Sequence, residues 1–181
     1  MSALLVELQA AYAIAQRPEL SEALAACGLR PGGPVWGVDF VAFDSHHYAP
    51  APGGKAAVIA PVFASDGDIM EIVDLVACGL ETRAMRTRSG VATVLGGQWV
   101  DMARETGGPL RLFPDAVEWL RNRGRGAVIL DQRAARFALA DVPAVNWCGD
   151  EKHARQLRHA MERPATIPQF FIREAAIHAP A

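Results

Sequence analysis

The chain has 181 residues, of which 51% are hydrophobic and 21% charged, and its formal net charge is -2. This composition is typical of a globular protein and excludes a collagen-like, coiled-coil or largely disordered chain, and the length favours a single domain over residues 1–181. Asp, Glu or Arg interrupts every apolar run before the roughly 18 residues that a membrane-spanning helix needs, so we expect no contact with a membrane.

Two short helices are predicted at the start of the chain. Apolar residues recur at helical spacing in residues 3–16, without the basic residues that begin a signal peptide, and residues 18–27 begin with a proline and stop before Gly28. We therefore expect a helical segment over residues 1–30, followed by a Pro- and Gly-rich linker. Three widely spaced cysteines favour reduced thiols and a cytoplasmic protein.

The next part of the chain predicts an antiparallel meander. Residues 35–43, 56–63 and 71–81 are rich in β-branched, aromatic and other apolar residues, and residues 65–68 supply turn chemistry between the second and third segments. Residues 44–54 form a long, proline-containing loop in the first hairpin.

After Gly90 the pattern alternates between strand and helix. Strands are predicted at 110–113, 126–130 and 144–147, and helices at 98–105, 114–123, 132–139 and 151–162. Short connections in this order favour right-handed crossovers and parallel strands. The predicted fold class is therefore α/β (α+β), in which N-terminal helices and the meander join a short parallel strand–helix segment in one mixed sheet. This core spans residues 35–163, and the tail, residues 164–181, contains an apolar stretch suited to an edge strand or to an oligomer contact.

The apolar phase of each predicted element indicates which side chains form the core. These residues are Val38, Phe40, Ile59, Val73, Leu75, Leu120, Val128, Leu130, Val145 and Leu157.

Motifs of several common chemistries are absent from the sequence. Gly53-Gly54-Lys55 is followed by alanine and not by the Ser or Thr of a phosphate-binding loop, and Gly124-Arg125-Gly126 precedes a strand, whereas a dinucleotide fingerprint follows one. No Gly-x-Ser-x-Gly, His-Glu-x-x-His or Cys-x-x-Cys motif occurs. We predict turn glycines at both positions, no metal site and no bound cofactor.

Two polar groups are nevertheless candidates for acid–base or metal chemistry. His46 lies in the polar residues 44–48, where it can share a face with Asp44, and the alternative is a solvated loop. Asp131 and Asp150 each follow a predicted parallel strand. If these strands are neighbours, the carboxylates meet at the carboxyl edge of the sheet, where open α/β folds bind ligands. The alternative is that each aspartate caps the helix that follows.

Positive charge is concentrated in the second half of the chain. Residues 1–80 contain three basic and nine acidic residues, and residues 81–181 contain fifteen and eleven. The predicted helix 151–162 has one apolar face and one basic face. A nucleic-acid-binding surface is predicted if residues 86–88 adjoin this helix, and solvated charge is the alternative. Its candidate residues are Arg86, Arg88, Lys152, Arg155, His159 and Arg163.

Residues 126–162, GAVILDQRAARFALADVPAVNWCGDEKHARQLRHAME, resemble the strand–helix–strand–helix part of a Toprim-type domain, the fold of primases and topoisomerases. The resemblance implies a magnesium site built from an acidic residue after the first strand and an Asp-x-Asp pair after a later one. Asp131 occupies the first position, but no such pair follows residues 144–147. The segments DLVA, LRLFPDAVEWLR and GAVILD also resemble uncharacterised bacterial and prophage proteins.

Three functions follow as hypotheses. The first is a non-catalytic binding or interaction protein of phage or mobile-element type that contacts nucleic acid or a protein partner through its basic half or its tail. The second is a metal-dependent phosphoryl-transfer or hydrolytic enzyme that uses Asp131, Asp150 and His46, with magnesium as its cofactor. The third is a structural subunit of a larger assembly.

Overall fold

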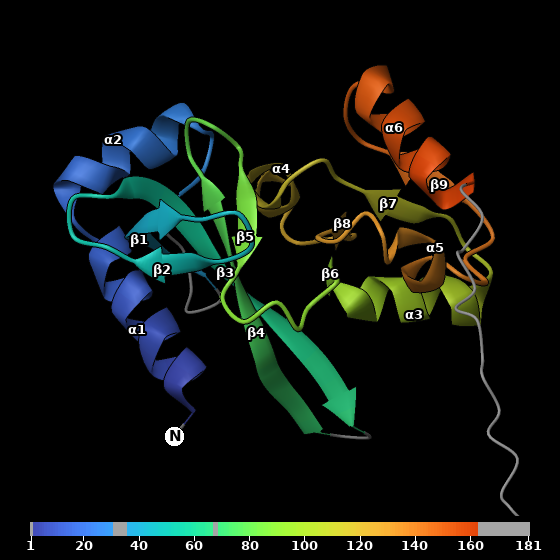
Figure 1. The fold of residues 1–181 in the computed structure, drawn as a ribbon, viewed down its shortest axis with the longest axis horizontal. Helices are drawn as coiled ribbons and strands as arrows, with labels where there is room; N and C mark the ends of the chain where they lie inside the picture. Colours follow the sequence, from blue (N-terminus) through green and yellow to red (C-terminus); the bar gives the residue numbers. More distant parts are fainter. Residues whose placement is uncertain (1, 31–35, 67–68, 163–181) are drawn as a thin grey trace, which may run out of the picture.

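The computed structural model describes residues 2–30, 36–66 and 69–162. Two parts lie side by side in Figure 1: a long, twisted sheet with two helices at one end of the molecule, and a smaller group of short strands and helices at the other. Among the described residues, no helix has the length and apolar character needed to cross a membrane.

Two helices begin the chain, as predicted. They are α1 (Ala3–Ala15) and α2 (Pro18–Ala26), and a proline occupies the first turn of α2. Helix α1 packs closely on the first strand: a Cβ atom placed on Gly37 would lie only 2.4 Å from the backbone of Ala11. Only glycine permits this approach of helix to strand.

The first sheet is the predicted antiparallel meander with two further strands. Its order is β2-β1-β3-β4-β5, and all its strand pairs are antiparallel. The strands are β1 (Gly37–Phe43), β2 (Tyr48–Pro50), β3 (Lys55–Asp66), β4 (Ile69–Gly79) and β5 (Met85–Thr87). The sequence did not predict β2, which lies in the expected loop, or β5, because a three-residue strand is too short to show alternation.

The second part contains the predicted alternation of strands and helices, preceded by a short strand that the sequence did not predict. Its elements are β6 (Val94–Leu95), α3 (Gly97–Thr106), β7 (Leu110–Leu112), α4 (Ala116–Arg121), β8 (Val128–Ile129), α5 (Ala135–Ala138), β9 (Val145–Trp147) and α6 (Glu151–Glu162). Strand β7 is parallel to β9, and a parallel bridge joins Leu112 to Ala127 beside β8. Strand β8 also pairs antiparallel with β6.

The α+β class, the meander and the parallel strands are thus confirmed. One detail differs from the expected arrangement, since the meander and the parallel strands form separate hydrogen-bonded sheets. The reason is that β6, where the chain leaves the meander, pairs with β8 and contacts β3 only by packing. Side chains and not a continuous ladder join the two parts.

Both faces of the long sheet are covered over its central part, which explains its nearly continuous apolar strands, while Ala64 and Met70 near the ends of β3 and β4 are exposed. Leu8 and Ala11 of α1 cover one face, against Ile59 and Leu75. The other face is covered by α2, α4, β6 and β8 in a cluster that includes Val38, Val76, Leu95, Trp119 and Val128. A third cluster lies within the second part and includes Val100, Leu110 and Leu157.

Most of the predicted core is confirmed. Val38, Ile59, Leu75, Val128 and Leu157 are buried, and Phe40, Val73, Leu120 and Leu130 are partly buried against the cluster that α2 and α4 cover. The prediction for Val145 is wrong, because this side chain is 41% exposed. Strand β9 pairs with β7 alone, and of its three residues only Trp147 is partly buried.

Candidate functional site

The two predicted catalytic aspartates are separated by a strand. Asp131 follows β8 and Asp150 follows β9, and β7 lies between these strands. The condition under which the two carboxylates would meet, that these strands are neighbours, is therefore not met, and two strand spacings place their ends roughly 10 Å apart. Both aspartates instead bond to the backbone that follows, since Asp131 Oδ1 accepts from Arg133 N at 2.9 Å and Asp150 Oδ1 from His153 N at 3.0 Å.

Asp150 also holds the side chain of His153. Its Oδ2 atom lies 2.5 Å from His153 Nδ1, and this hydrogen bond, with the one from the His153 backbone, lowers the pKa of Asp150. Both side chains are exposed. The capping interpretation of Asp150 is confirmed, and the carboxylate that was a metal-ligand candidate orients a neighbouring imidazole.

His46 lies in an exposed turn. The carboxylate of Asp44 accepts hydrogen bonds from the backbone N–H groups of His46 and His47, at 2.6 and 2.5 Å. These bonds, the one from His47 first, lower the pKa of Asp44. Asp44 therefore shapes the turn through the backbone. Within residues 2–30, 36–66 and 69–162, no three His, Cys, Asp or Glu side chains are grouped so that they could hold a metal ion.

The basic residues predicted to form one surface lie on separate parts of the molecule. Arg86 lies in β5, the edge strand of the long sheet, and Arg88 follows this strand, whereas α6 belongs to the second part and is drawn at the upper right of Figure 1. Arg88 donates to Glu7 Oε2 at 3.0 Å, and its guanidinium lies over the ring of Tyr48. Arg86 donates to two backbone carbonyl groups. The condition for a continuous patch is therefore not met.

Helix α6 has the two faces that the sequence predicts. Leu157 is buried and Met161 partly buried, while Lys152, Arg155 and His159 are exposed. Ion pairs within the helix occupy its arginines, since Arg155 bonds to Glu151 at 2.6 Å and Arg158 to Glu162 at 2.8 Å. Arg163 and the tail lie outside the described residues.

A basic groove lies elsewhere, between α3 and the starts of β7 and β8. Its volume is about 430 Å³, and Trp99 and Met102 of α3 form one side. Arg111 and Arg125 form the other side, and no Asp or Glu of the described chain lines it. No salt bridge among the described residues involves Arg111, Arg125 or the neighbouring Arg123. Within the described part of the chain, no carboxylate therefore forms an ion pair with the arginines of this groove.

The turn that carries Arg123 and Arg125 has a fixed conformation. Arg123 and Gly124 have φ angles of 59° and 67°, and the Trp119 indole donates to the Gly126 carbonyl at 2.7 Å in a buried hydrogen bond. Arg111 reaches the same turn, donating to Asn122 Oδ1 at 3.0 Å. A Cβ atom on Gly126 would lie 2.5 Å from the Arg111 carbonyl oxygen, so glycine is required there.

The sequence predicts only a turn at Gly124-Arg125-Gly126, and the arginines of this turn were not among the predicted nucleic-acid-binding residues. The available signal was local: three arginines occur in the six residues 121–126, in a segment rich in turn formers. The proximity of Arg111 and Trp99 to this turn depends on the pairing of β7 with the residues before β8. In comparisons with known proteins, no family model, curated protein or solved structure matches this chain.

Proposed function

We propose that the protein binds single-stranded nucleic acid in the groove between α3 and the turn 121–126, which we call the basic groove. The observation that carries the proposal is the juxtaposition of one aromatic side chain, Trp99, with Arg111 and Arg125 in a groove lined by no described carboxylate. Proteins that hold single strands combine these two features, since aromatic rings stack on bases and cationic side chains bind phosphates.

Each side of the groove has a separate task in this proposal. Trp99 stacks on one base, and Arg111, Arg123 and Arg125 contact the phosphates on either side of it. Arg111 is preoriented for this task, because Asn122 accepts one of its hydrogen bonds and its guanidinium lies 5.2 Å from the centre of the Phe113 ring. A groove of this kind contacts the phosphates of the nucleic acid and the flat face of a base, and every base offers both, so we expect little dependence on base sequence.

The sequence predicts that nucleic acid binds to the basic face of α6 together with residues 86–88. We propose instead that it binds in the basic groove. The arginines of α6 are ion-paired to glutamates of the same helix, and this reduces the charge that they offer to phosphate. The excess of basic residues after residue 80 is consistent with either surface. Reversal of charge on each surface separately therefore distinguishes them.

The test is fluorescence anisotropy with a labelled oligo(dT) and with a duplex, titrated at several salt concentrations. The double variant Arg123→Glu/Arg125→Glu should weaken binding of the single strand at least tenfold near 0.1 M salt and lower the slope of log K against log salt by about 1.4. The matched control Arg155→Glu/Arg158→Glu changes the formal charge equally and should bind within about threefold of the wild type, because paired surface charges contribute little.

A further variant separates stacking from charge. Trp99→Leu keeps an apolar side chain in the groove and should weaken binding by roughly 5- to 100-fold without changing the salt slope. Two results would overturn the proposal: no salt-dependent binding of the single strand at tens of micromolar protein, or a loss of binding in the α6 variant as large as that in the groove variant.

A further inference from the structure

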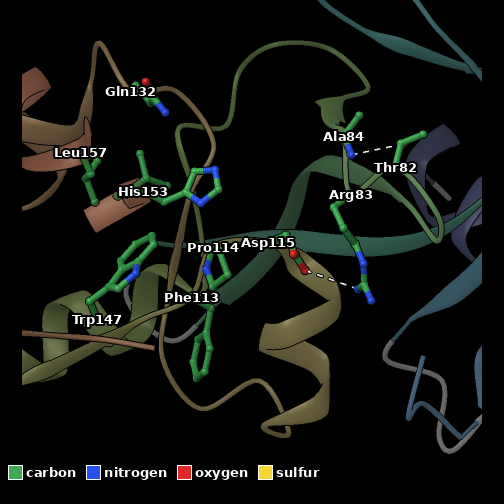
Figure 2. A pocket seen from close by; sticks show the side chains of 11 residues that line it. Thr82, Arg83, Ala84, Phe113, Pro114, Asp115, Gln132, Trp147, His153 and Leu157 are labelled. Atoms are coloured by element: carbon green, nitrogen blue, oxygen red, sulfur yellow. Dashed lines mark hydrogen bonds and ion pairs between the residues drawn. The ribbon is translucent and has the colours of Figure 1, made fainter. Parts of the chain in front are cut away.

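A second hollow lies at the opposite ends of the same parallel strands. Its volume is about 320 Å³, and it is lined by residues that follow β7, β8 and β9, together with the turn between β4 and β5. Figure 2 shows these side chains, with Arg83 and Asp115 on one side of Pro114 and with Trp147 and His153 on the other. Ligands of open α/β sheets bind at the carboxyl ends of parallel strands, which is the position of this cavity.

Arg83 and Asp115 give the cavity a hydrogen-bond donor and an acceptor side by side. Arg83 Nη1 is buried, lies 3.8 Å from Asp115 Oδ1, and has no hydrogen-bond partner among the described residues. Asp115 Oδ1 accepts from the Glu118 backbone at the start of α4, which leaves Oδ2 available. Arg83 also has a φ of 58°, a left-handed conformation that side chains rarely adopt and that persists where function or tight packing requires it.

The facing side is aromatic, and Asp150 fixes its orientation. The Trp147 indole donates to the Asp150 carbonyl at 2.8 Å, and the Asp150 carboxylate holds His153 Nδ1. His153 Nε2 remains for a ligand, since no described residue bonds to it. Phe113 adds a second ring to the lining.

Charge distinguishes the class of ligand that fits. The Arg83 charge is opposed by Asp115, and any charge on His153 is opposed by Asp150. The cavity therefore has no excess positive charge with which to hold a free phosphate or carboxylate. A neutral planar ring that presents an acceptor and a donor on one edge fits better, with the acceptor facing Arg83 and the donor facing Asp115 Oδ2.

We propose that this cavity binds the base of a free nucleoside or nucleotide, with the ring against Trp147 and its edge on Arg83 and Asp115. Nucleobases carry adjacent donors and acceptors on one edge of a flat ring. The site is distinct from the basic groove, which lies at the opposite ends of β7 and β8, and it does not depend on the function proposed for that groove.

The test is saturation-transfer difference NMR with guanosine, adenosine, cytidine and uridine as probes, followed by calorimetry on any nucleoside that binds. Inorganic phosphate and benzoate serve as comparison ligands. We expect at least one nucleoside to bind with a Kd below about 1 mM and the two anions to bind more weakly. The ring protons of the nucleoside should receive more saturation than those of its ribose.

Three variants test the assigned residues. Arg83→Asn removes the guanidinium and suits a left-handed backbone, and Asp115→Asn keeps the cap of α4, so both variants should fold. Each should weaken nucleoside binding about tenfold, the effect of losing one hydrogen bond to a charged group. Arg123→Asn is the matched control, since Arg123 has a φ of 59° but lies in the turn beside the basic groove and does not line the nucleoside cavity. It should leave nucleoside binding unchanged.

Three results would overturn the proposal: no nucleoside that saturates, nucleosides that bind no better than phosphate or benzoate, or binding that Arg83→Asn and Asp115→Asn leave unchanged. Failure of the basic-groove proposal has a different readout, the oligonucleotide anisotropy, so the two proposals can fail separately.

Discussion

The buried carboxylate of Asp74 offers the sharpest test of how the two parts of the molecule are joined. Asp74 lies in β4 and has no exposed surface. Its Oδ1 atom accepts hydrogen bonds from the backbone N–H groups of Leu75, Arg88 and Ser89, and Oδ2 accepts from Val91 and Ala92, all between 2.9 and 3.1 Å. One side chain thus holds the segment that leads from β5 to β6.

Removal of this carboxylate should destabilise the protein strongly. Asp74→Ala removes an acceptor from five backbone donors. Arg88 N keeps a second acceptor, the Leu75 carbonyl oxygen at 2.8 Å, and Ser89 and Val91 are exposed, so water replaces part of the remaining loss. We expect the free energy of unfolding to fall by about 3 to 5 kcal/mol, a large share of the stability of a typical domain. Asp74→Asn keeps one carbonyl oxygen and turns an N–H group toward a backbone donor, so a loss of about 2 to 3 kcal/mol is expected.

Lowering the pH should destabilise the wild-type protein in part, because protonation of Asp74 weakens the same hydrogen bonds. Burial alone raises the pKa of Asp74, but the hydrogen bonds from Ala92, Ser89 and Leu75 outweigh it and hold the pKa below its ordinary value of 3.8. A lowered folded-state pKa contributes stability that is complete above the unfolded-state pKa and is lost as the pH falls through the folded-state pKa. Wild-type stability should therefore decline below about pH 4, and Asp74→Asn should lack this part of the decline.

Urea unfolding followed by tryptophan fluorescence, at pH 7 and at several values between pH 5 and pH 3, measures both effects. Asp101→Ala is the control, because Asp101 is exposed and bonds only to Arg104 among the described residues, so a change within about 0.5 kcal/mol is expected. A loss below about 1 kcal/mol in Asp74→Ala would refute the reasoning, since five accepted hydrogen bonds could not then be structurally important.

Three further predictions concern single sites. Gly126→Ala should lower the free energy of unfolding by about 2 to 3 kcal/mol, because its φ is 136° and the new Cβ would clash with a carbonyl oxygen, whereas Gly97→Ala, with open space around it, should not destabilise. Tyr48→Phe should cost about 1 kcal/mol in urea unfolding, because the phenol donates to Glu7 at 2.9 Å, and an unchanged midpoint would contradict this. Leu157→Ala should cost about 2 to 3 kcal/mol and speed hydrogen exchange throughout α6, since Leu157 is the buried residue of that helix, and unchanged exchange would show that α6 is held otherwise.

The pattern of apolar and capping residues within a segment was enough to predict the longer helices and strands. Helix α6 is an example, because Asp150 at its start and apolar side chains at Ala154, Leu157 and Met161 all lie within one segment. The helix α3 and the long strands β3 and β4 were predicted for the same reason. Two- and three-residue strands such as β2, β5 and β6 do not span a full period, so nothing within them distinguishes strand from loop.

The sequence by itself thus determined the α+β class, the meander and the alternation after Gly90, since each depends on residues a few positions apart. For Asp150 it left two roles open, a site carboxylate or a helix cap, and the structure shows the cap. Only the tertiary structure decided that β7 lies between β8 and β9, which separates Asp131 from Asp150. It also decided that Arg111 meets the turn 121–126 and that Asp74 is buried against a segment fourteen to eighteen residues away. Strand order and loop docking are fixed by contacts between distant segments, and such contacts leave no periodic signal in the segments that make them.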